Sequence, residues 1–374
     1  MKKLIALLLA VVMVLGLAAC ATKTETPATD TPATDTPAAS TETETKTETK
    51  EETPAEETTG DAYDPSKTTL TMATILINHP VLRIVELGFA EACEDLGYQY
   101  QIVGTETQDN NDMCAAAEAA AAAGSTGCLL WAGDSTCFPT IKTLKNDYDC
   151  VVGVPHVQYA QADIPELDIN MACISTTYAQ AVCDFMAEKL EGKTGSIQIT
   201  QASYVENEVA AADAFKARFE ELQSQGKFEG VTLLEPAIEG ASDITESTNV
   251  NVSLLQAHPD IIATFGLTGN SPVTWTNAAK KCGYSAGDLL IVGMDYTADN
   301  LKNVEEGWVA CLVGQPLYEE AYQVVVNIDK VLRGESVEYW TELEAPLIYA
   351  GGEGVHDPAT YTGILDRVSA KFGD

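Results

Sequence analysis

A short apolar segment followed by an amphipathic helical segment, residues 70–97, constrains the fold of this chain more than any other stretch. Residues 70–77 read LTMATILI, which is typical of a strand buried on both faces of a parallel sheet and too short for a globular helix. Pro80 then stands at a favourable first helical position, apolar residues recur at helical spacing, and Gly97 stands where the helix should end. The sequence therefore predicts a strand, a polar loop and a helix, with the loop at the sheet edge where ligands bind.

The same unit of strand, loop and helix recurs down the chain, which predicts an α/β fold with parallel sheets. Because crossovers between parallel strands are right-handed, each half of the chain should form a doubly wound lobe. We expect further strands at residues 100–103, 128–131, 150–154, 196–200, 231–234, 261–265, 289–294 and 309–313. We expect the intervening helices at 112–123, up to 144, 178–190, 209–223, 247–257, up to 281 and 317–332.

The first twenty residues have the pattern of a secretory leader. Lys2 and Lys3 precede an apolar run over residues 4–15, and small residues lead up to Cys20. The run is shorter than the ~20 residues that span a membrane. The tetrad LAAC resembles the lipobox of bacterial lipoproteins, which implies a signal peptide over 1–19 and a lipidated Cys20 that anchors the protein to the outer face of the cell membrane. A plain signal peptide with a chance Cys is the alternative.

Residues 21–65 consist mostly of Thr, Glu, Pro, Ala, Asp and Lys, a composition that cannot bury enough apolar surface to fold. We interpret 20–65 as the lipidated Cys followed by a disordered tether, and 66–374 as a domain long enough for two lobes. Of the formal net charge of −35, five Lys and twelve acidic residues place −7 on residues 1–65 and leave −28 on the rest. This balance argues against nucleic acid as a partner.

No enzyme signature is found in the sequence. It contains neither a nucleophile elbow, a zinc-protease motif nor a phosphate-binding glycine loop, and its four His residues are scattered. The nine Cys residues after Cys20 form no C-x-x-C pair, so we expect mostly free core thiols. The sequence thus predicts a non-enzymatic protein without a metal or other cofactor.

Several phrases in their order along the chain carry a family resemblance. They are the loop Asn78–His79–Pro80, AHPDIIATF at 257–265, IVGMD ending at Asp295, and Gly314–Gln315–Pro316 followed by VLRGE. In these phrases the chain resembles the periplasmic sugar-binding proteins of bacterial ABC importers, the ribose- and galactose-binding branch with type I topology. The resemblance covers Thr69 to Ala350. It implies an α/β fold of two Rossmann-like lobes with parallel sheets joined by three crossing segments.

The resemblance also implies where the lobes divide. The crossings would fall near Cys173, near Gln315–Pro316 and near residues 338–341. Lobe one would then comprise about 66–173 and 316–339, and lobe two about 174–315 and 340–374.

Two residues match ligand positions of that family, Asp295 at a strand end and Gln315 at a crossing. Pro155–His156 stand where ribose binders carry Asp–Arg, which argues against ribose as the ligand. Structural alternatives remain for each position: a cap for Asp295, a hinge contact for Gln315, core packing for the Trp residues and loop hydrogen bonds for the His residues. The predicted ligand-binding residues are His79, Trp131, His156, Tyr204, Thr268, Asp295 and Gln315, with Trp275 as a further candidate.

The resemblance implies a monomeric receptor that captures a small polar solute, a sugar or sugar-like compound, between two lobes. Its partners would be the permease and ATPase subunits of an ABC transporter. A sensory lipoprotein of the same fold, which signals to a membrane receptor, is the alternative. A surface lipoprotein hydrolase is a third and weaker reading.

Overall fold

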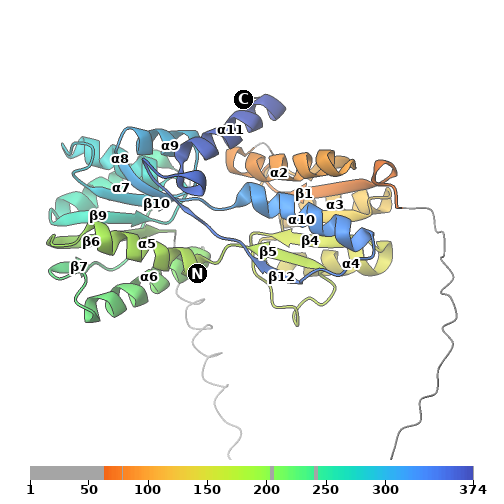
Figure 1. The fold of residues 1–374 in the computed structure, drawn as a ribbon, viewed down its shortest axis with the longest axis horizontal. Coiled ribbons are helices and arrows are strands. Elements are labelled where there is room, and N and C mark those ends of the chain that lie inside the picture. Colours follow the sequence, from red (N-terminus) through yellow and green to blue (C-terminus); the bar gives the residue numbers. More distant parts are fainter. Residues whose placement is uncertain (1–62, 78, 203–205, 240–242, 374) are drawn as a thin grey trace, which may run out of the picture. The chain divides into compact units, whose positions relative to one another are not determined.

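Two β-sheets with flanking helices make up the described part of the chain, and three segments connect them (Figure 1). The computed structural model describes residues 63–77, 79–202, 206–239 and 243–373, all within one compact unit that spans 60–374. Among these residues no helix has the length and apolar character needed to cross a bilayer. The alternation of strands and helices confirms the predicted α/β class.

The first sheet has the strand order β12-β5-β4-β3-β1-β2, and all its pairs are parallel. β1 lies between β3 and β2 and is buried along almost its whole length, as its apolar sequence predicts. The strands are β1 (Thr69–Thr74), β2 (Gln99–Gly104), β3 (Gly127–Leu130), β4 (Val151–Pro155), β5 (Ile169–Ala172) and β12 (Trp340–Glu342). The helices that pack with them are α2 (Pro80–Leu96), α3 (Asn110–Ala122), α4 (Phe138–Tyr148) and α10 (Leu317–Leu332).

The second sheet repeats the same winding, with the order β13-β11-β10-β9-β6-β7. Its pairs are parallel except that β13 runs antiparallel to β11, and a short β8 pairs with β6. The strands are β6 (Gly195–Gln201), β7 (Val231–Leu233), β8 (Ala237–Ile238), β9 (Ile261–Gly266), β10 (Leu290–Met294), β11 (Val309–Val313) and β13 (Leu347–Ile348). The helices of this half are α5 (Ser175–Lys189), α6 (Glu206–Ser224), α7 (Ile244–Ala257), α8 (Ser271–Lys281) and α9 (Ala298–Glu305).

The three connections between the sheets run through residues 173–174, 314–316 and 343–346. The first two coincide with the crossings that the family resemblance implies. The third lies a few residues later than expected, because Trp340 pairs with Asn170 and keeps β12 in the first sheet.

The opening unit forms the predicted strand, loop and helix, but β1 ends at Thr74 and residues 75–77 belong to the loop. The capping of α2 explains where the helix begins and ends. The Nδ1 atom of His79 accepts a hydrogen bond from the Val81 N–H at 3.3 Å, and Pro80 occupies the first turn. Gly97 ends the helix with a φ of 82°, a left-handed conformation that glycine adopts at little cost. This cap places the loop before α2 at the carboxyl end of β1.

A final helix, α11 (Pro358–Phe372), was not predicted from the sequence. It follows the second sheet in chain order, yet it contacts both α2 and α9. Lys371 lies 2.6 Å from Glu94, and Arg367 lies 3.5 Å from Glu91. Helix α11 therefore contacts both halves of the fold.

The contact between α2 and α10 depends on a glycine, and the two helices lie side by side in Figure 1. A Cβ atom at Gly88 would lie 2.2 Å from the backbone oxygen of Tyr318. We therefore expect Gly88→Ala to lower the free energy of unfolding by about 1–3 kcal/mol, because the two backbones would have to separate.

Urea denaturation measures this effect. The matched control is Gly363→Ala on α11, where a Cβ meets no atom within 4 Å. This control should leave stability unchanged or raise it by up to about 1 kcal/mol. A Gly88→Ala protein as stable as the parent would show that the helices are not in close contact at this position.

Candidate functional site

A cavity of about 230 Å³ lies at the carboxyl ends of the parallel strands, where open α/β sheets bind their ligands. Residues from both halves of the fold line it. A second cavity of about 310 Å³ adjoins the first and shares four of its residues: Val81, Trp131, Gly269 and Asp295. The first cavity is lined by Val81, Trp131, His156, Cys173, Ser175, Tyr178, Asn207, Glu208, Leu267, Gly269, Asp295, Gln315 and Leu317.

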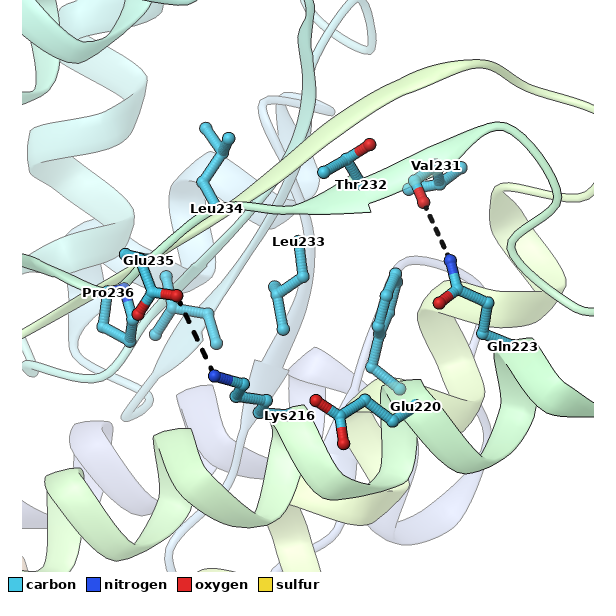
Figure 2. A pocket seen from close by; sticks show the side chains of 11 residues that line it. Lys216, Glu220, Gln223, Val231, Thr232, Leu233, Leu234, Glu235 and Pro236 are labelled. Carbon is cyan, nitrogen blue, oxygen red and sulfur yellow. Dashed lines mark hydrogen bonds and ion pairs between the residues drawn. The ribbon is translucent and has the colours of Figure 1, made fainter.

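A different cavity, of about 220 Å³, lies between α6 and residues 231–236 (Figure 2). At its rim Gln223 donates a hydrogen bond to the Val231 oxygen, and Lys216 lies 3.9 Å from Glu235. Most of its lining is apolar, and it contains none of the residues predicted from the sequence. The strand-end cavity is therefore the candidate site.

Asp295 follows β10 directly and is held in place by backbone contacts. Its N–H donates to the Val313 oxygen at 3.0 Å, and its φ is 66°. The Asn300 side-chain amide donates to the oxygens of Asp295, Met294 and Gly269 at 3.0, 3.1 and 3.0 Å, respectively. One amide thus fixes two neighbouring strand-end loops.

The Asp295 carboxylate lies against a glycine and is poorly solvated. A Cβ at position 269 would come within 2.5 Å of Asp295 Oδ2, so a larger residue there would displace the carboxylate. The Oδ1 atom is buried and has no hydrogen-bond partner among the described residues. Burial raises the Asp295 pKa to about 6, although the nearby charge of His156 lowers it in part. Oδ1 is thus an acceptor without a donor among the described residues.

His156 follows β4 and forms one wall of the cavity. Its ring stacks on that of Trp131, with centroids 4.9 Å apart and an angle of 19° between the planes. The His156 Nδ1 atom lies 3.3 Å from Glu320 Oε2, and the Oε1 atom accepts from the Cys173 N–H at 3.3 Å. The fully buried Glu320 of α10 thereby joins the His156 loop to the first crossing.

The charge of His156 depends on two opposing effects. Burial lowers its pKa, but the attraction and hydrogen bond of Glu320, together with the charge of Asp295, outweigh burial and raise it. The protonated ring is consequently favoured between two carboxylates.

Glu208 and Gln315 are two further polar residues of the cavity. Glu208, in the first turn of α6, accepts the Ala202 N–H at 2.6 Å through Oε2. Burial raises its pKa to about 7; the Ala202 bond lowers it and the charges of Glu239 and Asp295 raise it further. Gln315 lies in the second crossing and lines the same cavity.

The structure brings five of the predicted residues to the two adjoining cavities: His79, Trp131, His156, Asp295 and Gln315. Thr268 is not among the lining residues. Its hydroxyl is buried and donates to Glu239 Oε1 at 2.9 Å, so the hydroxyl is paired with a residue that does not line either cavity. Trp275 is a core residue whose Nε1 donates to Thr200 Oγ1 at 3.0 Å. Tyr204 lies outside the described residues.

Several residues of the lining were missed from the sequence, among them Glu208 and Tyr178, and so was Glu320, the partner of His156. A charged residue on the apolar face of α10, between Leu317 and Ala321, was a usable signal for Glu320. Glu208 follows the loop after β6, so its place at a strand end was a second signal. Tyr178 looked like an ordinary core position of α5.

Other expectations concern cysteine and metal. The described cysteines, nine in number, are free thiols, and seven of them are buried. No cluster of His, Cys, Asp or Glu suited to a metal ion is found among the described residues.

Comparison with known families gives a match over most of the chain. The periplasmic binding protein domain matches residues 72–336. The ribose import binding protein RbsB of Escherichia coli K12 is 24% identical over 277 residues, which cover 73% of this chain and 88% of that protein. Its Haemophilus influenzae counterpart is 23% identical over 280 residues, with the same coverage of 73% and 88%.

Solved structures share the fold at low sequence identity. A sugar-binding protein of a sugar ABC transporter from Bacillus halodurans aligns with a TM-score of 0.67 and 18% identity, over 77% of this chain and 98% of that one. A solute-binding protein from Agrobacterium vitis bound to α-D-tagatopyranose aligns with a TM-score of 0.65 and 17% identity, over 79% and 98%.

The raised pKa of Asp295 predicts a stability effect with a definite sign. The folded state holds the proton more tightly than the unfolded chain, so stability falls as pH rises from about 4 through about 6. In ligand-free protein, Asp295→Asn should raise the free energy of unfolding by about 1–3 kcal/mol at pH 7.5 and by less than about 1 kcal/mol at pH 4.

Denaturation at the two pH values measures the difference. Asp134→Asn is the opposite control, since hydrogen bonds from Thr136 lower the Asp134 pKa and the charged form is the favoured one. This variant should not gain stability at pH 7.5. An Asp295→Asn protein no more stable than the parent at pH 7.5 would contradict the description of Asp295 as a poorly solvated carboxylate.

Proposed function

The chain belongs to the periplasmic binding protein family, in the sugar-binding group that serves ABC importers, and from this premise we propose that it captures a sugar or sugar-like solute in its strand-end cavity. As a member of this family it is a binding protein and not an enzyme. The bound solute would be delivered to the permease and ATPase of an importer.

One observation carries the choice of site: the Asp295 Oδ1 atom is buried at the cavity without a donor among the described residues. An unpaired buried acceptor costs free energy that a ligand hydroxyl can recover. Sugars supply such hydroxyls together with weakly apolar faces, which suit the stacked rings of Trp131 and His156. The lining thus offers both kinds of contact that a sugar needs.

The identity of the sugar is a separate matter. The named relatives are ribose import proteins, but here Pro155–His156 stand where the resemblance places Asp–Arg. The His156 ring, which stacks on Trp131, stands where the resemblance places an Arg of the ribose binders, whose guanidinium would donate hydrogen bonds. This difference favours a ligand other than ribose.

Calorimetry tests the site with a panel of aldopentoses, aldohexoses and their 2-amino derivatives. Asp295→Ala should weaken the best-bound compound about ten- to a hundredfold, because a hydrogen bond to a charged group contributes about 1.5–3 kcal/mol. Gln315→Ala loses a neutral partner and should cost about 1 kcal/mol. Both variants should fold, since neither side chain belongs to an apolar core.

The control for this series is Glu235→Ala, whose side chain lines the cavity of Figure 2 and not the candidate site, and which should bind like the parent. Unchanged affinity in Asp295→Ala would overturn the site assignment. A panel without any binding compound would overturn the proposed function.

We also propose that Cys20 carries the lipid that holds the protein at the outer face of the cell membrane. Labelled palmitate should enter the parent protein and not Cys20→Ser, and the variant should leave the membrane fraction. Equal labelling of both proteins would exclude Cys20 as the acceptor.

A further inference from the structure

The strand-end cavity has an excess of negative groups. Its described lining contains the two carboxyl groups of Glu208 and Asp295 and one imidazole, that of His156, but no Lys or Arg. Neither carboxyl group forms an ion pair with a Lys or Arg among the described residues. Any positive charge that balances this lining must come from His156 or from the ligand.

The imidazole cannot balance both carboxylates. His156 Nδ1 lies 3.3 Å from Glu320 Oε2, so the nearest negative group is the buried Glu320 and not a lining residue. The positive charge of His156 also acts on Asp295 and lowers its pKa. Glu208 receives no such contribution.

The surroundings of Glu208 disfavour the ionised form of its carboxyl group. Its Oε2 atom accepts one backbone N–H, from Ala202 at 2.6 Å. Burial and the charges of Glu239 and Asp295 hold its pKa at about 7, despite that bond. A neutral sugar would leave this repulsion in place, whereas a cation between Glu208 and Asp295 would relieve it.

Aromatic faces near the two carboxyl groups favour the same ligand chemistry. Trp131 lines the cavity from one half of the fold and Tyr178 from the other. Aromatic faces attract cations through their quadrupoles, and Trp does so most strongly. The stacked His156 covers one face of Trp131, so at most the other face is available for such a contact.

We propose that the ligand of this cavity carries a protonated amine beside its hydroxyl groups, as in an amino sugar, and that Glu208 and Asp295 together bind the ammonium group. This inference rests on the proposed function, because it specifies the class of solute that the same site takes. Asp295 contributes to any sugar-like ligand, and Glu208 supplies the preference for the amine.

Calorimetry at pH 7 tests the preference with matched compounds. D-Glucosamine and D-galactosamine are compared with D-glucose and D-galactose, and with the two N-acetyl derivatives, which keep the nitrogen but lose its charge. For at least one parent sugar, the amine should bind at least tenfold more tightly than both the sugar and its N-acetyl form.

The variant Glu208→Gln assigns the effect to the residue. A glutamine retains an oxygen for the Ala202 N–H, so the start of α6 should stay intact. The ratio of amine to parent-sugar affinity should fall to within threefold in this variant and remain unchanged in Glu235→Gln, whose side chain lines a different cavity. Circular dichroism and thermal melting establish that each variant is folded.

The outcomes separate this inference from the proposed function. If neither amine binds at least tenfold more tightly than its parent sugar and its N-acetyl form, or if Glu208→Gln keeps the full ratio, the inference is overturned while the sugar-binding function stands. If no member of the full sugar panel binds, the proposed function fails and the inference fails with it.

Discussion

The buried amide of Asn300 fixes the loops from which the cleft is built. Its contacts with the oxygens of Met294, Asp295 and Gly269 tie the end of β10 to the loop after β9. A non-glycine residue at positive φ costs about 1–3 kcal/mol, and Asp295 adopts a φ of 66°. The hydrogen bonds of Asn300 offset that strain and direct the carboxylate toward the cavity.

The same arrangement places groups where the folded protein alone cannot satisfy them. Asp295 loses water, Glu208 lies near other carboxylates, and both pKa values rise as a result. These two carboxyl groups lower the stability of the ligand-free protein. A solute that supplies hydrogen-bond donors or positive charge removes this cost on binding, which raises its affinity. Glu320 links α10 to the His156 loop and to the first crossing. Movement of the two halves would change both contacts.

Much of the fold follows from local sequence, but the site follows only in part. Apolar runs ending in Gly, Asn or Asp predicted the strands and their ends, and the family resemblance then implied that Asp295 and Gln315 belong to the site. Thr268 shares such an end, yet its hydroxyl faces the buried Glu239, a partner 29 residues away. The contact of α11 with α2, which includes the ion pair of Lys371 and Glu94, also joins residues far apart in the sequence. The spacing of residues along the sequence does not reveal such contacts.

Native mass spectrometry of freshly purified protein tests most directly whether the cleft is built around Asp295 to hold a solute. A closed cleft retains its ligand, so the parent protein should carry a small polar adduct at one copy per chain. Asp295→Ala, prepared in parallel from the same growth medium, should have lost it. An adduct present at equal occupancy in both proteins would contradict the assignment of the site to these strand ends.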